Sequence, residues 1–340
     1  MAHTRISNKM PPHIEPARAP IAFGRRAIPK LNEELASEDL VTRQCALASL
    51  CDLVHDPERA YETIETGCLE NLKRLLRDKD SVVRRKTTEV LYELSVHNVG
   101  RDAFLQNEVI LSLAELLDEP VDICRVNMHK TLEMLSEFTP GAAGIVDAGL
   151  VPQLVLKLPS ELVEIQEIIL DTLHFCLRVN VSQALASGAI SILKEKLLHN
   201  SVAIRSKAAQ ALMGICVPLE GKNEVCKQNI IPILVRLLKD RHPEVAAKAA
   251  GSLMIATITT QGKYAALKAM AIPPLLQLVS SPVTEVSLNA IKAITTLAEA
   301  PEGRQELLNH VAVLESKQDH SSEIIRRAAG TAVRVITWKP

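Results

Sequence analysis

Residues 67–94 read GCLENLKRLLRDKDSVVRRKTTEVLYEL. Apolar residues recur at spacings of three and four before and after the polar turn at 78–81, a pattern typical of two amphipathic helices. Leu72, in the first of these helices, belongs to a ladder of leucines with successive gaps of 39 or 41 residues: Leu31, Leu72, Leu113, Leu154, Leu193, Leu234, Leu275 and Leu314. Helical patterning with a period of about 40 residues predicts stacked repeats, none of which can bury its apolar face alone.

Two further columns run in step with the ladder. One is apolar and comprises Leu50, Leu91, Leu132, Leu173, Leu212, Leu253, Ile294 and Val333; the other is Gly100, Gly141, Gly221, Gly262 and Gly303. A shorter helix is expected between successive pairs, for instance at 57–66, so each repeat has a short helix, a second helix that carries the ladder leucine, and a third helix. The turn between the short and the second helix favours residues that tolerate positive φ, and it falls at Gly67, Glu108, Gly149, Gly188, Asn229 and Met270.

These columns divide the chain into three parts. Residues 1–26 contain four prolines and are expected to form an extended, basic, Pro-rich arm, because proline removes backbone donors and disfavours helix in the residue before it. Residues 27–336 form the repeat array, with repeats starting near 27, 67, 108, 149, 188, 229, 270 and 309, and residues 337–340 are a C-terminal tail. The predicted fold class is all-α, a right-handed α-solenoid of about eight repeats.

Composition and charge narrow the function classes. Only eight of 340 residues are aromatic, so the interior must consist of Leu, Ile, Val and Ala, which suits packed helices. The net charge is −1, but residues 1–30 carry +5 and residues 317–340 carry +3, which leaves −9 for the middle. Basic ends suggest contacts with acidic partners, although charged termini are often only solvated.

The repeat pattern resembles the armadillo repeat over residues 27–336. The family motif, a glycine and then an apolar residue followed by Leu-x-x-Leu-Leu, is matched at residues 67–76 and closely at 229–238. The resemblance implies that the third helices line a concave face. Nuclear-import receptors of this family present asparagine there, where this chain has Asp52, Glu93, Met134, Phe175, Gly214, Ile255, Thr296 and Val335, so clamping of a basic peptide is not supported.

One polar column marks the start of the third helices and includes five arginines: Arg43, Arg84, Arg125, Arg205 and Arg326. Asp39 and Asp80 each precede an arginine by four residues, so acid and base can pair within the helix while the acid faces the positive helix terminus. Similar pairs in armadillo-like and HEAT-like repeats act as struts between repeats, which is the favoured interpretation. The competing hypothesis is that these arginines bind partners, together with Arg18, Arg25 and Arg26 of the arm.

Motifs for catalysis or cofactor binding are missing from the sequence. GxxxxGK[ST], GxSxG, HExxH and metal-spaced His/Cys clusters do not occur, so no catalytic, cofactor-binding or metal-ligating residue is predicted. Seven cysteines without a CxxC pair and a start without an apolar leader favour a reducing, intracellular location. No run of 18 apolar residues predicts a membrane span, and no aromatic column supports RNA binding.

A more specific resemblance lies in the arm and the first repeats. Residues 19–35, APIAFGRRAIPKLNEEL, together with 87–92 and 97–101, are similar to the radial spoke head proteins of armadillo type. That resemblance implies a non-enzymatic structural scaffold in the stalk or neck of the axonemal radial spoke of motile cilia and sperm flagella. Its partners would be other spoke stalk and head proteins, and its location the cytoplasm, cytoskeleton and axoneme. A cytosolic armadillo adaptor in signalling or trafficking is the alternative.

Overall fold

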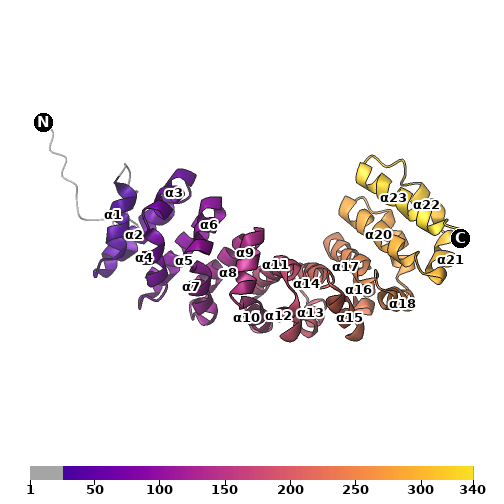
Figure 1. Ribbon diagram of the computed structural model, residues 1–340, viewed down its shortest axis with the longest axis horizontal. Helices are drawn as coiled ribbons and strands as arrows, with labels where there is room; N and C mark the ends of the chain where they lie inside the picture. Colours follow the sequence, from indigo (N-terminus) through magenta and orange to yellow (C-terminus); the bar gives the residue numbers. More distant parts are fainter. Residues whose placement is uncertain (1–25, 340) are drawn as a thin grey trace. The chain divides into compact units, whose positions relative to one another are not determined.

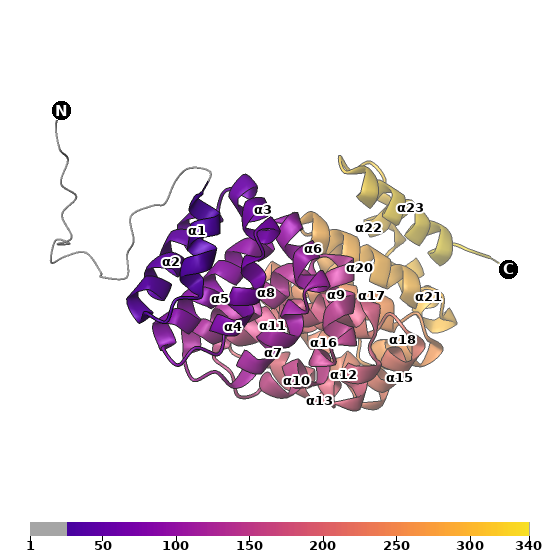
Figure 2. The ribbon, with the colours of Figure 1, turned by 60° about the vertical axis from the view of Figure 1, so that its left-hand side comes forward.

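The computed structural model describes residues 26–339, which fold into helices joined by turns and short loops, without a strand in that part of the chain. The chain divides into two compact units, an N-terminal unit at 1–148 and a C-terminal unit at 149–340. Figures 1 and 2 show the helices of each unit stacked in chain order. The prediction of an all-helical α-solenoid is confirmed.

The third helices are the long elements of the stack. In the N-terminal unit they are α2 (Leu40–Leu53), α5 (Ser81–Val96) and α8 (Asp122–Ser136). In the C-terminal unit they are α11 (Val163–Val179), α14 (Val202–Ile215), α17 (Pro243–Ala256), α20 (Thr284–Leu297) and α23 (Glu323–Ile336). Within each unit, the third helix of one repeat packs against the third helix of the next repeat. The third helices of a unit therefore form a continuous layer.

The second helices carry the ladder leucines. They are α1 (Ala27–Leu35), α4 (Cys68–Leu75) and α7 (Val109–Ala114), which continues as the 3-10 helix η1 (Glu115–Asp118), then α10 (Leu150–Lys157), α13 (Ala189–Lys196), α16 (Ile231–Leu237), α19 (Ile272–Val279) and α22 (Val311–Glu315). The short helices are α3 (Pro57–Glu65), α6 (Asn98–Gln106), α9 (Thr139–Asp147), α12 (Ser182–Ala186), α15 (Leu219–Lys227), α18 (Thr260–Lys268) and α21 (Pro301–Leu308). All eight ladder leucines are buried, so the column does mark the core.

Six turns place a residue in the left-handed region. Gly67, Gly149 and Gly188 have φ between 69° and 77°, and Glu108, Asn229 and Met270 have φ between 55° and 59°. These are the six positions expected from the sequence, each between a short helix and the next second helix. Glycine reaches this region without the steric penalty that a Cβ brings, so the three non-glycine turns store some strain.

The glycine column has a different cause, which is a close backbone approach. A Cβ on Gly100, Gly141, Gly221, Gly262 or Gly303 would lie only 1.8–2.3 Å from the carbonyl oxygen six residues earlier, at the end of the preceding third helix. The glycine thus lets the short helix cross directly over that end. A basic residue follows four of the five glycines and can bond to the end of the preceding helix: Lys222 Nζ donates to Val217 O at 2.6 Å, and Arg101 Nη1 donates to Ser95 O at 2.8 Å.

Candidate interaction surface

Arg84 shows how the arginine column is used. Its Nη1 donates to the carbonyl oxygens of Asp78 and Lys79, at 2.9 and 3.1 Å, and so closes the loop before α5. Its Nε and Nη2 donate to the two carboxylate oxygens of Glu119, at 3.0 and 2.8 Å. The Arg84 and Glu119 side chains are only 15% and 7% exposed, so this bidentate pair is well shielded from solvent.

Two other arginines of the column form the same strut, each with an acid 35 residues ahead. Arg43 Nε lies 3.0 Å from Asp78 Oδ2, and Arg205 Nε donates to Asp240 Oδ2 at 2.9 Å. Each arginine also donates through Nη1 to two carbonyls of its own loop. The interpretation as struts between repeats therefore holds, but the partner is an acid one repeat later.

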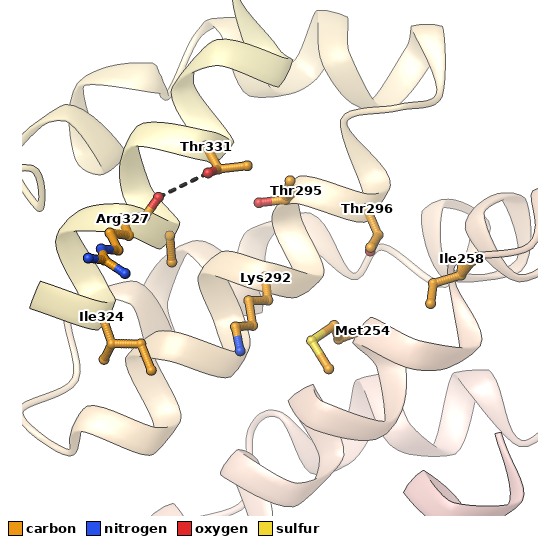
Figure 3. Close-up of a pocket in the computed structure, with 9 residues that line it drawn as sticks. Met254, Ile258, Lys292, Thr295, Thr296, Ile324, Arg327 and Thr331 are labelled. Atoms are coloured by element: carbon orange, nitrogen blue, oxygen red, sulfur yellow. Dashed lines mark hydrogen bonds between the residues drawn. The ribbon is translucent and has the colours of Figure 1, made fainter. Parts of the chain in front are cut away.

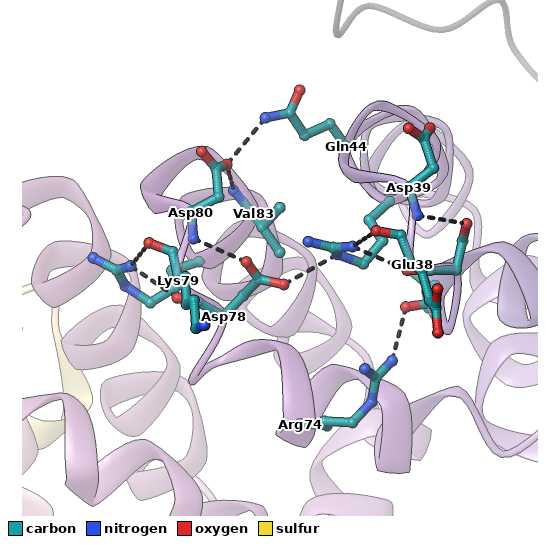
Figure 4. Close-up of polar contacts among 12 residues, drawn as sticks. Glu38, Asp39, Gln44, Arg74, Asp78, Lys79, Asp80 and Val83 are labelled. Atoms are coloured by element: carbon teal, nitrogen blue, oxygen red, sulfur yellow. Dashed lines mark hydrogen bonds and ion pairs between the residues drawn. The ribbon is translucent and has the colours of Figure 1, made fainter.

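The expected pairing within the helix is wrong. Asp39 accepts from the backbone N–H of Thr42 at 2.8 Å and Asp80 from that of Val83 at 3.0 Å, so both are helix caps. Figure 4 shows Asp78 and Asp80 side by side in the loop before α5, with Gln44 donating to Asp80 from α2. The carboxylate of a capping aspartate must point to the backbone N–H groups at the start of its own helix. The arginine of that helix can therefore pair with an acid in the loop of the next repeat.

One loop residue can therefore serve two arginines. Asp78 offers its carboxylate to Arg43 and its carbonyl oxygen to Arg84. Glu119 likewise offers its carboxylate to Arg84 and its carbonyl oxygen to Arg125, the latter at 2.7 Å. Although burial of Glu119 opposes ionisation, the hydrogen bonds from Arg84 and the Val121 amide hold the pKa of its carboxyl below its usual value.

The column also includes Gln166, Ala246 and Ser287. Arg125, Gln166 and Arg326 make further contacts of other kinds. Arg125 bonds to its own helix start through Asp122 Oδ1 at 2.8 Å, and Arg326 bonds to the carbonyls of His320 and Ser321. At Gln166 the cation comes from the next repeat instead, because Lys196 Nζ donates to Gln166 Oε1 at 2.7 Å. Burial of Lys196 lowers the pKa of its ammonium group.

The structure distributes the predicted binding residues unevenly. Arg18 and Arg25 lie outside the described residues, and Arg26 is exposed just before α1. The five column arginines all donate to main-chain carbonyls of their own loops, so a partner would have to compete with these bonds. The binding hypothesis for these arginines stays a prediction.

An open groove lies on the third helices α17, α20 and α23, with a volume of about 470 Å³. It is lined by Met254, Ile258, Lys292, Thr295, Thr296, Ile324, Arg327, Ala328 and Thr331. Figure 3 shows Met254 and Ile258 on one side, Ile324 and Arg327 on the other, and Lys292 between them. Ile258 and Ile324 are 55% and 52% exposed, so the groove presents apolar surface to solvent.

The polar groups of the groove differ in whether they are already bonded. Thr295 and Thr331 donate to carbonyls of their own helices, and the hydroxyls of Thr296 and Thr257 lie 2.7 Å apart. Arg327 forms an ion pair with Glu323 at the groove edge. The Lys292 ammonium has neither a hydrogen bond nor an ion pair within residues 26–339.

The column position of Lys292 is occupied differently in the preceding repeat. One repeat earlier, Gly251 stands where Lys292 stands, and a Cβ on it would lie 3.0 Å from the sulfur and terminal carbon of Met213. Met213 is thus packed over the glycine. The groove residues were not among those predicted from the sequence. The sequence did contain a signal, because one column changes from glycine at 251 to lysine at 292.

Other reactive groups are held in structural roles. None of the seven cysteines, all within residues 26–339, forms a disulfide, and burial raises the pKa of Cys51, Cys68, Cys176 and Cys216 to about 12. A search of residues 26–339 finds no group of three or more His, Cys, Asp or Glu side chains placed to hold a metal ion. Within the same residues no single helix is long and apolar enough to cross a bilayer; α9 and α10 meet that test only when counted together.

This arrangement of three-helix repeats defines the class of protein as an α-solenoid. Residues 220–253, which span α15, α16 and most of α17, match the Armadillo/beta-catenin-like repeat model. The structure is similar to that of an engineered protein, with a TM-score of 0.85 and 22% identity over 91% of this chain and 78% of the other. It is also similar to a designed armadillo repeat protein in complex with the peptide (KR)4, with a TM-score of 0.62 and 20% identity over 67% of this chain and 99% of that one. The fold is therefore the armadillo-like solenoid.

Proposed function

We propose that this chain is a non-enzymatic scaffold that holds other proteins on the face formed by its third helices. The observation that carries the proposal is the exposed, partly apolar groove on α17, α20 and α23. A rigid backing suits this role, because the shielded struts tie successive repeats and keep such a surface preorganised. The peptide complex of the designed armadillo protein supports the use of this fold for binding extended chains.

The particular assembly we propose is the radial spoke of motile cilia and sperm flagella. The support is the similarity of residues 19–35, 87–92 and 97–101 to the radial spoke head 14 homologue, also called the rhabdoid tumour deletion region protein. In this proposal the chain lies in the spoke stalk or neck, in the axoneme, and contacts other stalk and head proteins. Its role there is to anchor and space its neighbours.

Fractionation of motile cilia tests this assignment. The full chain, carrying an epitope tag, is expressed in ciliated cells, and the cilia are extracted with non-ionic detergent. A spoke component is expected to stay with the microtubule pellet, together with other spoke proteins. Release of most of the chain into the detergent supernatant would instead support the cytosolic adaptor.

Removal of residues 1–25 tests the arm. Helix α1 begins at Ala27, so this deletion takes away no described helix, and the far-ultraviolet circular dichroism and melting temperature of the purified chain should not change. If Arg18 and Arg25 help to dock the chain, the truncated protein should be partly lost from the axonemal pellet. Retention at the level of the full chain would remove the arm from the proposal.

A further inference from the structure

We infer that the groove on α17, α20 and α23 binds an acidic segment of a partner protein that inserts an apolar side chain. The inference rests on the proposed scaffold function and adds the chemistry of one partner. Two properties of the groove carry it, namely the sign of its charge and the apolar side chains around that charge.

The charge of the groove is positive. Lys292 and Arg327 are the two ionisable residues among the nine that line it, and Arg334 on α23 donates to the Thr331 hydroxyl at 3.3 Å from the adjoining hollow. The nearby carboxylates already have cations of their own: Glu285 pairs with Lys248 and Glu323 with Arg327. Lys292 is thus a half-buried cation without an acid among residues 26–339, and a carboxylate from a partner would supply one.

The apolar side chains flank this cation on both sides. Met254 reaches the groove from α17 and Ile258 from the turn after it, and Ile324 and Ala328 reach it from α23. Methionine adapts its shape to different partners, and a volume of about 470 Å³ lies in the range of ordinary ligand sites. An apolar side chain of the partner would fit between these two apolar walls of the groove, one formed by Met254 and Ile258 and the other by Ile324 and Ala328. A carboxylate next to it in the partner would then be within reach of Lys292.

Two other occupants fit the groove less well. A basic peptide such as (KR)4 would meet Lys292 and Arg327 with charge of the same sign. A single-stranded nucleic acid would need aromatic faces for its bases, but the groove lining has none, and the face of Trp338 in the adjoining hollow is already covered by Arg304, 5.0 Å from the ring centre. A protein segment that is acidic and partly apolar satisfies both properties.

A random peptide library displayed on phage tests the inference without knowledge of the partner. The library carries 12-residue peptides and is panned on the purified full chain at physiological salt. Enriched peptides are expected to be acidic and to contain Leu, Ile, Phe or Met, and their affinity should fall as salt rises. Enrichment of neutral or basic peptides, or no enrichment at all, would overturn the inference.

Charge reversal shows whether the peptides sit in the groove. In the double variant Lys292→Glu/Arg327→Glu the affinity of the selected peptides should fall at least tenfold, and a fresh panning should now enrich basic peptides. The matched control is Lys227→Glu on α15, whose side chain is 76% exposed and far along the chain from the groove, and it should bind as the unaltered protein does. Peptides that bind the double variant undiminished would place the site elsewhere.

The apolar walls have their own variants. Ile258→Ser and Ile324→Ser change exposed side chains, so folding should not suffer, but each should weaken the selected peptides at least threefold. Leu219→Ser on α15, where the leucine is 60% exposed, is the control. An RNA oligonucleotide that competes with the peptides would favour nucleic acid. Failure in these binding assays leaves the cilium fractionation unaffected, so the inference and the proposed function can fail separately.

Discussion

At the scale of single residues, glycine has two distinct uses in this chain. Gly67, Gly149 and Gly188 supply a left-handed turn, and a Cβ there would meet no atom within 4 Å. Gly100, Gly141, Gly221, Gly262 and Gly303 supply room, because the preceding helix end lies where their Cβ would be. The two groups should therefore respond differently to substitution.

Alanine at Gly221 should be strongly destabilising. Its Cβ would lie 1.8 Å from the Ile215 carbonyl oxygen, so α15 has to move away from α14. Overpacking of this kind costs about 1–3 kcal/mol, which should lower the midpoint of urea unfolding. The control is Gly330→Ala inside α23, where a Cβ meets nothing within 4 Å and alanine should stabilise the helix by about 0.5–1 kcal/mol. Equal effects of the two substitutions would contradict the close approach.

Much of this residue-scale pattern could be predicted from the sequence. The buried ladder leucines and all six positive-φ positions follow from helical periodicity and from the need to turn between helices. The reason for the glycine column could not be predicted, because it depends on how closely one helix crosses another. The groove was missed for the same reason, since it depends on how side chains of neighbouring third helices pack against one another.

At the scale of helices and loops, the struts explain why the loops before the third helices are polar and yet ordered. Arg43, Arg84 and Arg205 each join two main-chain carbonyls to an acid 35 residues ahead. The arginine column could be recognised in the sequence as a structural feature, but its partners could not. An aspartate four residues before an arginine suggested an ion pair within one helix. Asp39 and Asp80 instead cap the N-termini of their helices by accepting from backbone N–H groups.

Replacement of Arg84 by alanine measures one strut. It leaves the buried Glu119 carboxylate and two loop carbonyls without the Arg84 donor, which should cost about 1–3 kcal/mol in urea unfolding at pH 7. Arg77→Ala is the matched control, because Arg77 also reaches an acid in the next repeat, Glu115, but is 67% exposed. The control should show no measurable loss, since solvent screens an exposed pair. A loss as large as that of Arg84→Ala would mean that burial does not decide the strength of these pairs.

At the scale of the whole molecule, each repeat depends mainly on its neighbours in the chain. Stability in such an array is approximately a sum of local terms, so damage to one repeat should stay local. Native-state hydrogen exchange can check this helix by helix. Gly221→Ala should speed exchange in α15, α16 and α17, which contact one another or α18, and should leave α2 and α5 unchanged. Arg84→Ala should speed exchange in α2 and α5 and leave α15, α16 and α17 unchanged. A uniform increase in exchange rate over all helices in either variant would indicate that the array unfolds as one cooperative unit.

The spacing of the struts bears on how such a chain can change its length. Arg43 and Arg84 are 41 residues apart, and so are their acids Asp78 and Glu119. Loss of residues 44–84 would therefore leave Arg43 with Glu119 at the distance along the chain that Asp78 has now. Gain or loss of one whole period keeps the separation of 35 residues between donor and acceptor, whereas an insertion of another length between them changes it. Duplication or deletion of an entire repeat is thus compatible with the ion pairs between repeats, because it keeps the number of residues between each arginine and its acid.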